Sequence, residues 1–185
     1  DTLLTVFKTT NGREVIDGRG IVPDIEVEKE TLSRLSSLIL LKDFVFHFAT
    51  DYTQRFHSIA TPEKFSLSDL EYKAFVDFVI SDNGFSYESA TQLKLKEFKT
   101  LAIEEGYFNQ IESSYGSIAT AVSSDLEKEL FSAKDELSRW IESEIVSRYY
   151  FQSGASRYSF RFDLYVLKAV EILKDLESYN EILMP

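Results

Sequence analysis

The first 30 residues and the rest of the chain follow two different hydrophobic patterns. Between Phe7 and Val27, apolar and polar residues alternate and are interrupted by turn residues, which is typical of short strands. From residue 31 onward, apolar residues recur at every third or fourth position, which is typical of amphipathic helices. The sequence therefore predicts a mainly α fold, in which a short β-hairpin and strand segment precedes a helical bundle-like domain.

The strand segment is centred on an Asn-Gly pair at residues 11–12. A type I′ turn needs positive φ at both central positions, so this pair predicts a two-residue connection between Thr10 and Arg13. Residues 17–20 predict a second turn, and the alternation of residues 25–28 predicts a third, half-buried strand. Two or three short strands are not stable alone in water. We therefore expect them to pack on the helices or to complete a sheet that lies elsewhere.

Capping signals divide the remainder of the chain into helices. A serine precedes Glu or Gln by three residues at Ser68, Ser89 and Ser124, and each such capping box predicts a helix start. The last of these opens the longest predicted helix, from Leu126 to Tyr149, which we expect Ser153-Gly154 to end. An earlier helix carries one apolar stripe of seven residues: Leu41, Phe44, Val45, Phe48, Ala49, Tyr52 and Phe56.

Composition excludes several classes of function. The net charge is −11 with 31 acidic and 20 basic residues, and a nucleic acid would be repelled by the average field of such a chain. The absence of cysteine excludes disulfides, thiolate metal sites and a cysteine nucleophile. The longest apolar run, Leu38 to Leu41, is far shorter than the roughly 20 residues that span a bilayer.

A motif in the strand segment carries a family resemblance. Residues 11–25 contain Asn-Gly-Arg followed by Asp-Gly-x-Gly-Ile-x-Pro-Asp-Ile. This run resembles the segment that closes the protease domain of carboxy-terminal processing (tail-specific) peptidases, which are serine peptidases with a Ser/Lys dyad. It looks most like the bacterial branch with a helical C-terminal extension. The resemblance implies that residues 1–30 are the final strands of an incomplete protease domain and residues 31–185 a helical C-terminal domain.

The same resemblance implies a function. The chain would be the non-catalytic C-terminal portion of a tail-specific serine endopeptidase that hydrolyses envelope proteins near their C-termini, with the helical domain bracing or regulating the protease. The implied location is the periplasm or cell envelope. The implied partners are the upstream protease domain and protein substrates or adaptors, with homo-oligomerisation open. The alternative is a stand-alone helical protein-protein interaction module with no enzymatic activity.

No catalytic residue is predicted within the chain. The family's nucleophile turn and its lysine are both missing, and because the chain begins at Asp1 we expect it to be a fragment whose catalytic residues lie upstream. Residues 153–156, Ser-Gly-Ala-Ser, are superficially similar to a nucleophile turn, but we interpret them as a helix end. His47 and Asp51 could meet on one helix face, yet a third metal ligand is missing. We predict no catalytic, cofactor-binding or metal-binding residue, and no cofactor.

Two further features are interpreted structurally. Paired acidic residues such as Glu142 and Glu144 are interpreted as solvated helix surface. Residues 148–151, Arg-Tyr-Tyr-Phe, cluster three aromatic side chains beside a cation. This cluster could pack the strands against the helices or form a partner-binding patch, and we favour packing.

Overall fold

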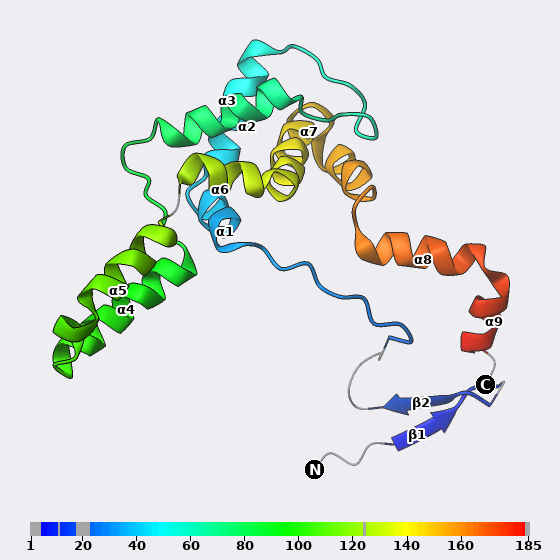
Figure 1. The fold of residues 1–185 in the computed structure, drawn as a ribbon. Coiled ribbons are helices and arrows are strands. Elements are labelled where there is room, and N and C mark those ends of the chain that lie inside the picture. Colours follow the sequence, from blue (N-terminus) through cyan, green and yellow to red (C-terminus); the bar gives the residue numbers. More distant parts are fainter. Residues whose placement is uncertain (1–4, 11, 18–22, 124, 184–185) are drawn as a thin grey trace. The chain divides into compact units, whose positions relative to one another are not determined.

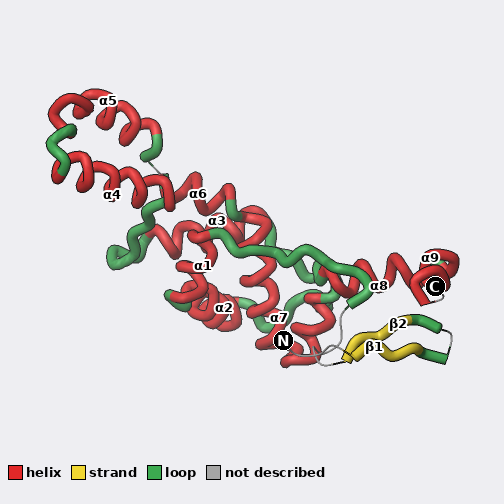
Figure 2. Tube along the Cα trace, turned by 90° about the horizontal axis from the view of Figure 1, so that it is seen from below, coloured by secondary structure: helices red, strands yellow, loops and turns green. Residues whose placement is uncertain are grey.

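The computed structural model describes residues 5–10, 12–17, 23–123 and 125–183. These residues form nine helices and one two-stranded antiparallel sheet, which confirms the mainly α fold class (Figure 1). In Figure 2, which is coloured by secondary structure, β1 and β2 are the two strands of the described part of the chain. The chain divides into two compact units, one made of residues 1–30 with 159–185 and the other of residues 31–158. The predicted domain division at residue 30 stays a prediction.

The first unit contains the sheet. Strand β1 (Thr5–Lys8) pairs with β2 (Glu14–Asp17), so the predicted hairpin is confirmed. The predicted third strand is not formed, because no described strand lies beside residues 25–28 to share ladder hydrogen bonds. The alternation of that segment is nevertheless visible in its burial, since Ile25 and Val27 are half-buried between exposed glutamates. Residues 18–20 of the predicted second turn lie outside the described residues.

The hairpin connection is one residue longer than predicted. Thr9 N donates to Arg13 O at 2.8 Å and Gly12 N donates to Thr9 O at 2.9 Å, so residues 10–12 form a three-residue connection. Gly12 has φ 85°. A type I turn followed by one glycine with positive φ is the usual geometry of such a loop, and the Asn-Gly pair is compatible with it. The predicted two-residue turn is therefore wrong, while the requirement for glycine at residue 12 is confirmed. Asn11 lies outside the described residues.

Two helices complete the first unit, α8 (Leu164–Lys174) and α9 (Leu176–Leu183). Asp163 caps α8, because its carboxylate accepts from Tyr165 N at 2.9 Å and Val166 N at 3.2 Å. Neither helix has a buried residue. The apolar side chains of both helices are therefore all at least partly accessible.

In its described residues, the second unit contains one long helix and six shorter ones. The long helix is α7 (Lys134–Ser159). The shorter ones are α1 (Arg34–Leu41), α2 (Phe44–Arg55), α3 (Asp69–Ile80), α4 (Ala90–Glu104), α5 (Phe108–Ala121) and α6 (Leu126–Ser132). The core is formed by α1, α2, α3, α6 and α7, whose fully buried side chains include Ile39, Phe48, Tyr72, Phe75, Leu130 and Ile141.

The predicted stripe of α2 is buried over five of its seven residues. Leu41 and Phe56 are the exceptions, with 75% and 41% of their surface exposed. The reason is that the helix is interrupted at Lys42 and Asp43, so that Leu41 is the last residue of α1. Phe56 lies just beyond α2, which ends at Arg55. A continuous 3.6-residue pattern therefore ran across two helices.

Two of the three predicted capping boxes are confirmed. Ser68 begins α3 with Glu71, and Ser89 begins α4 with Gln92, each with both reciprocal hydrogen bonds. The third helix start is shifted by one residue, because Asp125 caps α6 by accepting from Glu127 N at 3.0 Å. Ser124 lies outside the described residues.

Helices α4 and α5 form a helical hairpin and lie side by side (Figures 1 and 2). Gly106, with φ 80°, ends α4, and Tyr107 N donates back to Ala102 O at 2.9 Å. The Lys99 ammonium lies 5.1 Å from the Phe108 ring centre and 5.5 Å from that of Tyr115. Ala102 is the one buried residue of these two helices.

The longest predicted helix is divided and also extends further than predicted. It breaks at Ala133, between α6 and α7, and α7 then continues past Gly154 to Ser159. The interruption in α7 falls at Phe151, which has φ 57° and ψ −164°. Gly154 is buried and packs against Tyr150, so it serves a close contact and does not end the helix.

Candidate functional site

The serines of the Ser-Gly-Ala-Ser run bond to their own helix. Ser153 Oγ donates to Tyr150 O at 3.3 Å and Ser156 Oγ donates to Gln152 O at 3.1 Å. These are the bonds that serines commonly make to a helix backbone, whereas a nucleophile needs a neighbouring base and oxyanion donors on a tight turn. The absence of catalytic residues from the chain stays a prediction.

The predicted His47–Asp51 pair lies on the surface of α2. His47 and Asp51 are both exposed on α2, and the His47 ring lies edge-on to Phe46 at 5.6 Å. No group of three or more potential metal ligands lies together in the described part of the chain. Among the described helices, none combines the length and apolarity that crossing a bilayer demands.

What the structure does bring together is a series of polar side chains of α7 that hold other segments. Near its start, Glu136 accepts from Ser33 N at 2.9 Å and from Ser36 Oγ at 2.8 Å. Ser33 is itself the cap of α1 and accepts from Ser36 N. One carboxylate of α7 therefore fixes the N-terminal end of α1.

Glu142 is the buried carboxylate of this series. Its side chain is 5% exposed, and it accepts from Leu67 N at 2.8 Å, Tyr158 Oη at 2.6 Å and Ser66 Oγ at 3.3 Å. The interpretation of Glu142 as solvated surface is therefore wrong. Three donors from two distant segments supply the hydrogen bonds that a buried carboxylate requires. Its spacing of four residues from the apolar Val146 is the signal in the sequence that places it at the edge of the buried face.

The aromatic cluster at residues 148–151 packs α7 against α2 and the loop that follows α2. Arg148 Nη2 donates to Phe46 O at 2.9 Å and to Thr50 Oγ1 at 3.0 Å. Tyr149 Oη donates to Phe56 O, and Tyr150 Oη donates to Ile59 O at 3.3 Å. These three residues do pack, but they join α7 to α2 and the following loop, whereas the interpretation expected strands to pack against helices. The Phe151 side chain is 77% exposed and does not take part in this packing.

A hollow of about 350 Å³ opens in the second unit between α1, α2 and α7. Two exposed aromatic side chains, Phe46 and Trp140, and two carboxylates, Asp43 and Glu144, border it. Leu40, Val45 and Ser143 complete the lining. Sequence reasoning did not identify this group, because Asp43 and Trp140 are 97 positions apart and neither belongs to a recognisable motif.

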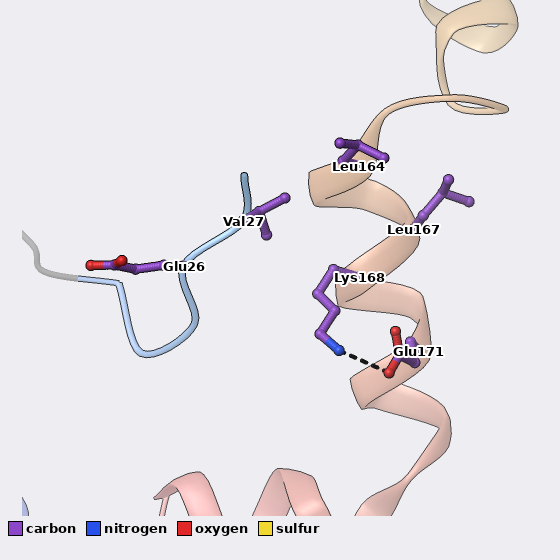
Figure 3. A pocket seen from close by; sticks show the side chains of 6 residues that line it. All are labelled: Glu26, Val27, Leu164, Leu167, Lys168 and Glu171. Carbon is purple, nitrogen blue, oxygen red and sulfur yellow. Dashed lines mark hydrogen bonds and ion pairs between the residues drawn. The ribbon is translucent and has the colours of Figure 1, made fainter. Parts of the chain in front are cut away.

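The first unit has a hollow of about 310 Å³ beside α8. Figure 3 shows Val27 facing Leu164. Leu167 and the Lys168–Glu171 ion pair, which is 2.8 Å long, lie further along α8. Glu26 also borders this hollow. The lining joins apolar side chains with an internally paired charge, and it offers neither a nucleophile with its base nor a set of metal ligands.

Comparison with known proteins gives one match. A family model described as the C-terminal helical domain of a probable PDZ-protease matches residues 35–173. The comparison with curated proteins and the comparison with solved structures gave no significant match. The matched region lies outside residues 11–25, so the match and the earlier resemblance to processing peptidases rest on different parts of the chain and agree.

Proposed function

This chain belongs to the family of C-terminal helical domains of probable PDZ-proteases, and we propose that it is the non-catalytic C-terminal portion of a tail-specific serine endopeptidase. In this proposal the complete enzyme hydrolyses envelope proteins near their C-termini, in the periplasm or cell envelope, through a Ser/Lys dyad upstream of Asp1. The motif of residues 11–25 supports these finer assignments. The helical domain braces the upstream protease domain or regulates access to it.

The observation that carries the proposal is the exposure of the hairpin on both faces. Successive side chains of a strand point to opposite faces. The cross-strand pair Val6 and Ile16 therefore lies on one face, 53% and 47% exposed, and the pair Phe7 and Val15 on the other, 53% and 42% exposed. A two-stranded sheet with apolar residues on both faces is not stable alone. It is the composition of strands that belong to a larger sheet covered on both sides.

A bracing role also fits the construction of the second unit. The side chains of Glu136, Glu142 and Arg148 each hold a segment that is far away in the sequence. Hydrogen bonds between distant segments favour one well-defined arrangement of the helices. Those of Glu142 satisfy a buried carboxylate, whereas the buried Nε of Arg148 has no partner among the described residues. Such a body can support a neighbouring domain without contributing to its chemistry.

Hydrogen exchange of the hairpin tests this proposal. We expect the amides of β1 and β2 to exchange slowly in the full-length parent protein and much faster in this chain alone, because the isolated hairpin lacks the rest of its sheet. Amides of α7 serve as the internal control and should be equally protected in both proteins. Equal protection of the hairpin in the two proteins would contradict its assignment to a protease sheet.

The second candidate, an interaction module with no enzymatic activity, is favoured by the α4–α5 hairpin. Five large apolar side chains of this hairpin are about half exposed: Phe98, Leu101, Ile103, Tyr107 and Ile118. A surface of this kind is typical of a partner-binding site. A peptidase assay on the full-length parent protein distinguishes the two candidates, since a module predicts no cleavage of an unfolded polypeptide and a protease predicts cleavage.

A further inference from the structure

We propose that the hollow between α1, α2 and α7 binds the guanidinium group of an arginine side chain presented by a polypeptide. That the arginine comes from a polypeptide rests on the proposed protease function. The guanidinium itself is inferred from the lining. No residue of this hollow belongs to the motif or to the hairpin surfaces discussed above.

Two elements supply the groups that would contact the guanidinium. Trp140, Ser143 and Glu144 occupy positions i, i+3 and i+4 of α7 and therefore share one helix face. Asp43 and Phe46 come from the start of α2. Each of these two helices thus supplies one aromatic side chain and one carboxylate to the lining, around a volume that accommodates a single large side chain.

The aromatic side chains point to a cationic ligand. Trp140 is 44% exposed and Phe46 is 51% exposed, although the core of the same unit buries comparable side chains completely. The face of an aromatic ring attracts a cation, and tryptophan does so most strongly. Guanidinium is planar and weakly hydrated, so it stacks on such rings better than an ammonium group does.

The structure contains an internal example of this recognition at the edge of the hollow. The Arg148 guanidinium lies 4.6 Å from the centre of the Phe46 ring, and its Nη2 lies 3.1 Å from Glu144 Oε1. An aromatic ring and a carboxylate from this lining thus already hold one guanidinium together. Trp140 and Asp43 supply a second aromatic ring and a second carboxylate to the same lining.

Asp43 is the residue on which the proposal depends most. It has φ 59°, a left-handed conformation that costs a non-glycine residue energy and is found preferentially at functional sites. Its carboxylate is exposed at the rim, and Glu144 is already paired with Arg148. Asp43 would therefore supply the charge for a bidentate contact with an incoming arginine. The net charge of −11 would favour the approach of a basic segment.

Trp140 makes the proposal directly testable, because it is the single tryptophan of the chain. Its fluorescence would be followed while the full chain is titrated with an acetylated and amidated Gly-Gly-Arg-Gly-Gly peptide. The matched peptide carries citrulline, which has the same shape as arginine without the charge. We expect a saturable change in emission with the arginine peptide and none with the citrulline peptide. An equal response to both peptides would overturn the proposal.

Two aspartates of the same region provide matched variants. Asp43→Asn keeps a side chain that tolerates the left-handed conformation, and it should weaken binding about tenfold, the loss expected for one charge-assisted hydrogen bond. Asp51→Asn, at an exposed position of α2 outside the hollow, should bind like the wild type. Glu144→Gln, read by calorimetry as well as fluorescence, is the second variant should Asp43→Asn unfold. Wild-type affinity in both Asp43→Asn and Glu144→Gln would contradict the site.

A negative result in the peptide titration and a negative result in the hydrogen-exchange experiment are independent of each other. Loss of hairpin protection depends on the first unit and on the upstream domain, whereas the fluorescence response depends on the second unit alone. A chain that binds no peptide but whose hairpin is protected only in the full-length protein would refute the arginine site and leave the protease assignment intact.

Discussion

Gly154 lies so close to Tyr150 that a Cβ atom at residue 154 would clash with the Tyr150 Cβ. Residues four apart in a regular helix do not approach each other in this way. The reason is the interruption at Phe151, where positive φ turns the chain between the two residues. The Ser-Gly-Ala-Ser run is thereby explained by packing, since glycine is the one residue that leaves room for the preceding turn.

The first prediction concerns this contact. Gly154→Ala should destabilise the protein by about 2 kcal/mol, because the new methyl group overpacks a buried contact whose neighbour is the backbone-attached Cβ of Tyr150. Thermal unfolding followed by circular dichroism measures the effect. Gly116→Ala in α5 is the matched control: a Cβ there meets nothing within 4 Å, and alanine is the better helix former, so stability should be unchanged or higher. Equal melting temperatures for wild type and Gly154→Ala would contradict the contact.

The second prediction concerns the buried carboxylate. Glu142→Ala should cost about 3 kcal/mol, because it leaves Leu67 N and Tyr158 Oη without their acceptor inside the protein. Tyr158→Phe removes a single donor and should cost about 1 kcal/mol. Urea unfolding of both variants and of the double variant gives the coupling between them. If the Glu142→Ala and Tyr158→Phe costs simply add, the two side chains do not stabilise each other through this hydrogen bond.

The third prediction concerns pH. Burial opposes ionisation of Glu71, but hydrogen bonds from Ser68 and Tyr52 outweigh it, and the pKa of this carboxyl is lowered from its ordinary value of 4.5. Because the folded-state pKa is the lower one, the stabilisation is fully present above about pH 4.5 and is lost as pH falls through the folded-state pKa. Glu71→Gln should therefore destabilise the protein at neutral pH and have little effect in strong acid.

Urea midpoints measured at about pH 7 and about pH 2 test that sign. Tyr52→Phe should remove part of the same pH dependence, since it deletes one donor to the carboxylate. Asp51→Asn, at an exposed position of α2, is the control and should leave the pH dependence close to that of the wild type. A penalty for Glu71→Gln that grows on acidification would reverse the sign and refute the assignment.

Local rules predicted the parts of this fold that depend on neighbours in the sequence. Ser68 and Ser89 mark helix starts because a capping box needs only four consecutive residues. Gly12 and Gly106 both adopt positive φ, which is a property of the backbone at those positions. The exact length of the hairpin loop was not predictable, because the same Asn-Gly pair serves two loop geometries and strand register decides between them.

Features that depend on distant contacts were missed. Glu142 is buried because Leu67, from a remote segment, and Tyr158, from beyond the interruption of α7, supply donors that the helical pattern around Glu142 does not show. Phe151 interrupts α7 directly after Tyr149 and Tyr150, whose hydroxyl groups donate to carbonyl oxygens that follow α2, and these contacts are not visible in the local sequence. Tertiary packing outweighs local propensity at such positions.

The fourth prediction concerns the hairpin turn. Gly12→Val should loosen the hairpin, because a β-branched residue resists the φ of 85° that residue 12 adopts. The readout is exchange of the Thr9 amide, which donates to Arg13 O across the turn, and the expected loss of local stability is about 1 to 2 kcal/mol. Gly12→Asn is the control, since asparagine tolerates positive φ and should retain most of the protection. Unchanged exchange at Thr9 in Gly12→Val would show that the turn does not constrain the hairpin.

The last prediction concerns catalysis. The isolated chain should not cleave an unfolded polypeptide, because the nucleophile turn and the lysine of the resembled family are missing from its sequence, and Ser153 and Ser156 donate to the backbone of their own helix. Product formation over hours, with the full-length parent protein as the positive control, is the measurement. Ser153→Ala and Ser156→Ala should behave like the unmodified chain in this assay. Cleavage by the isolated chain that disappears in Ser153→Ala would place a nucleophile in this domain, and the bracing role would then have to be replaced by a catalytic one.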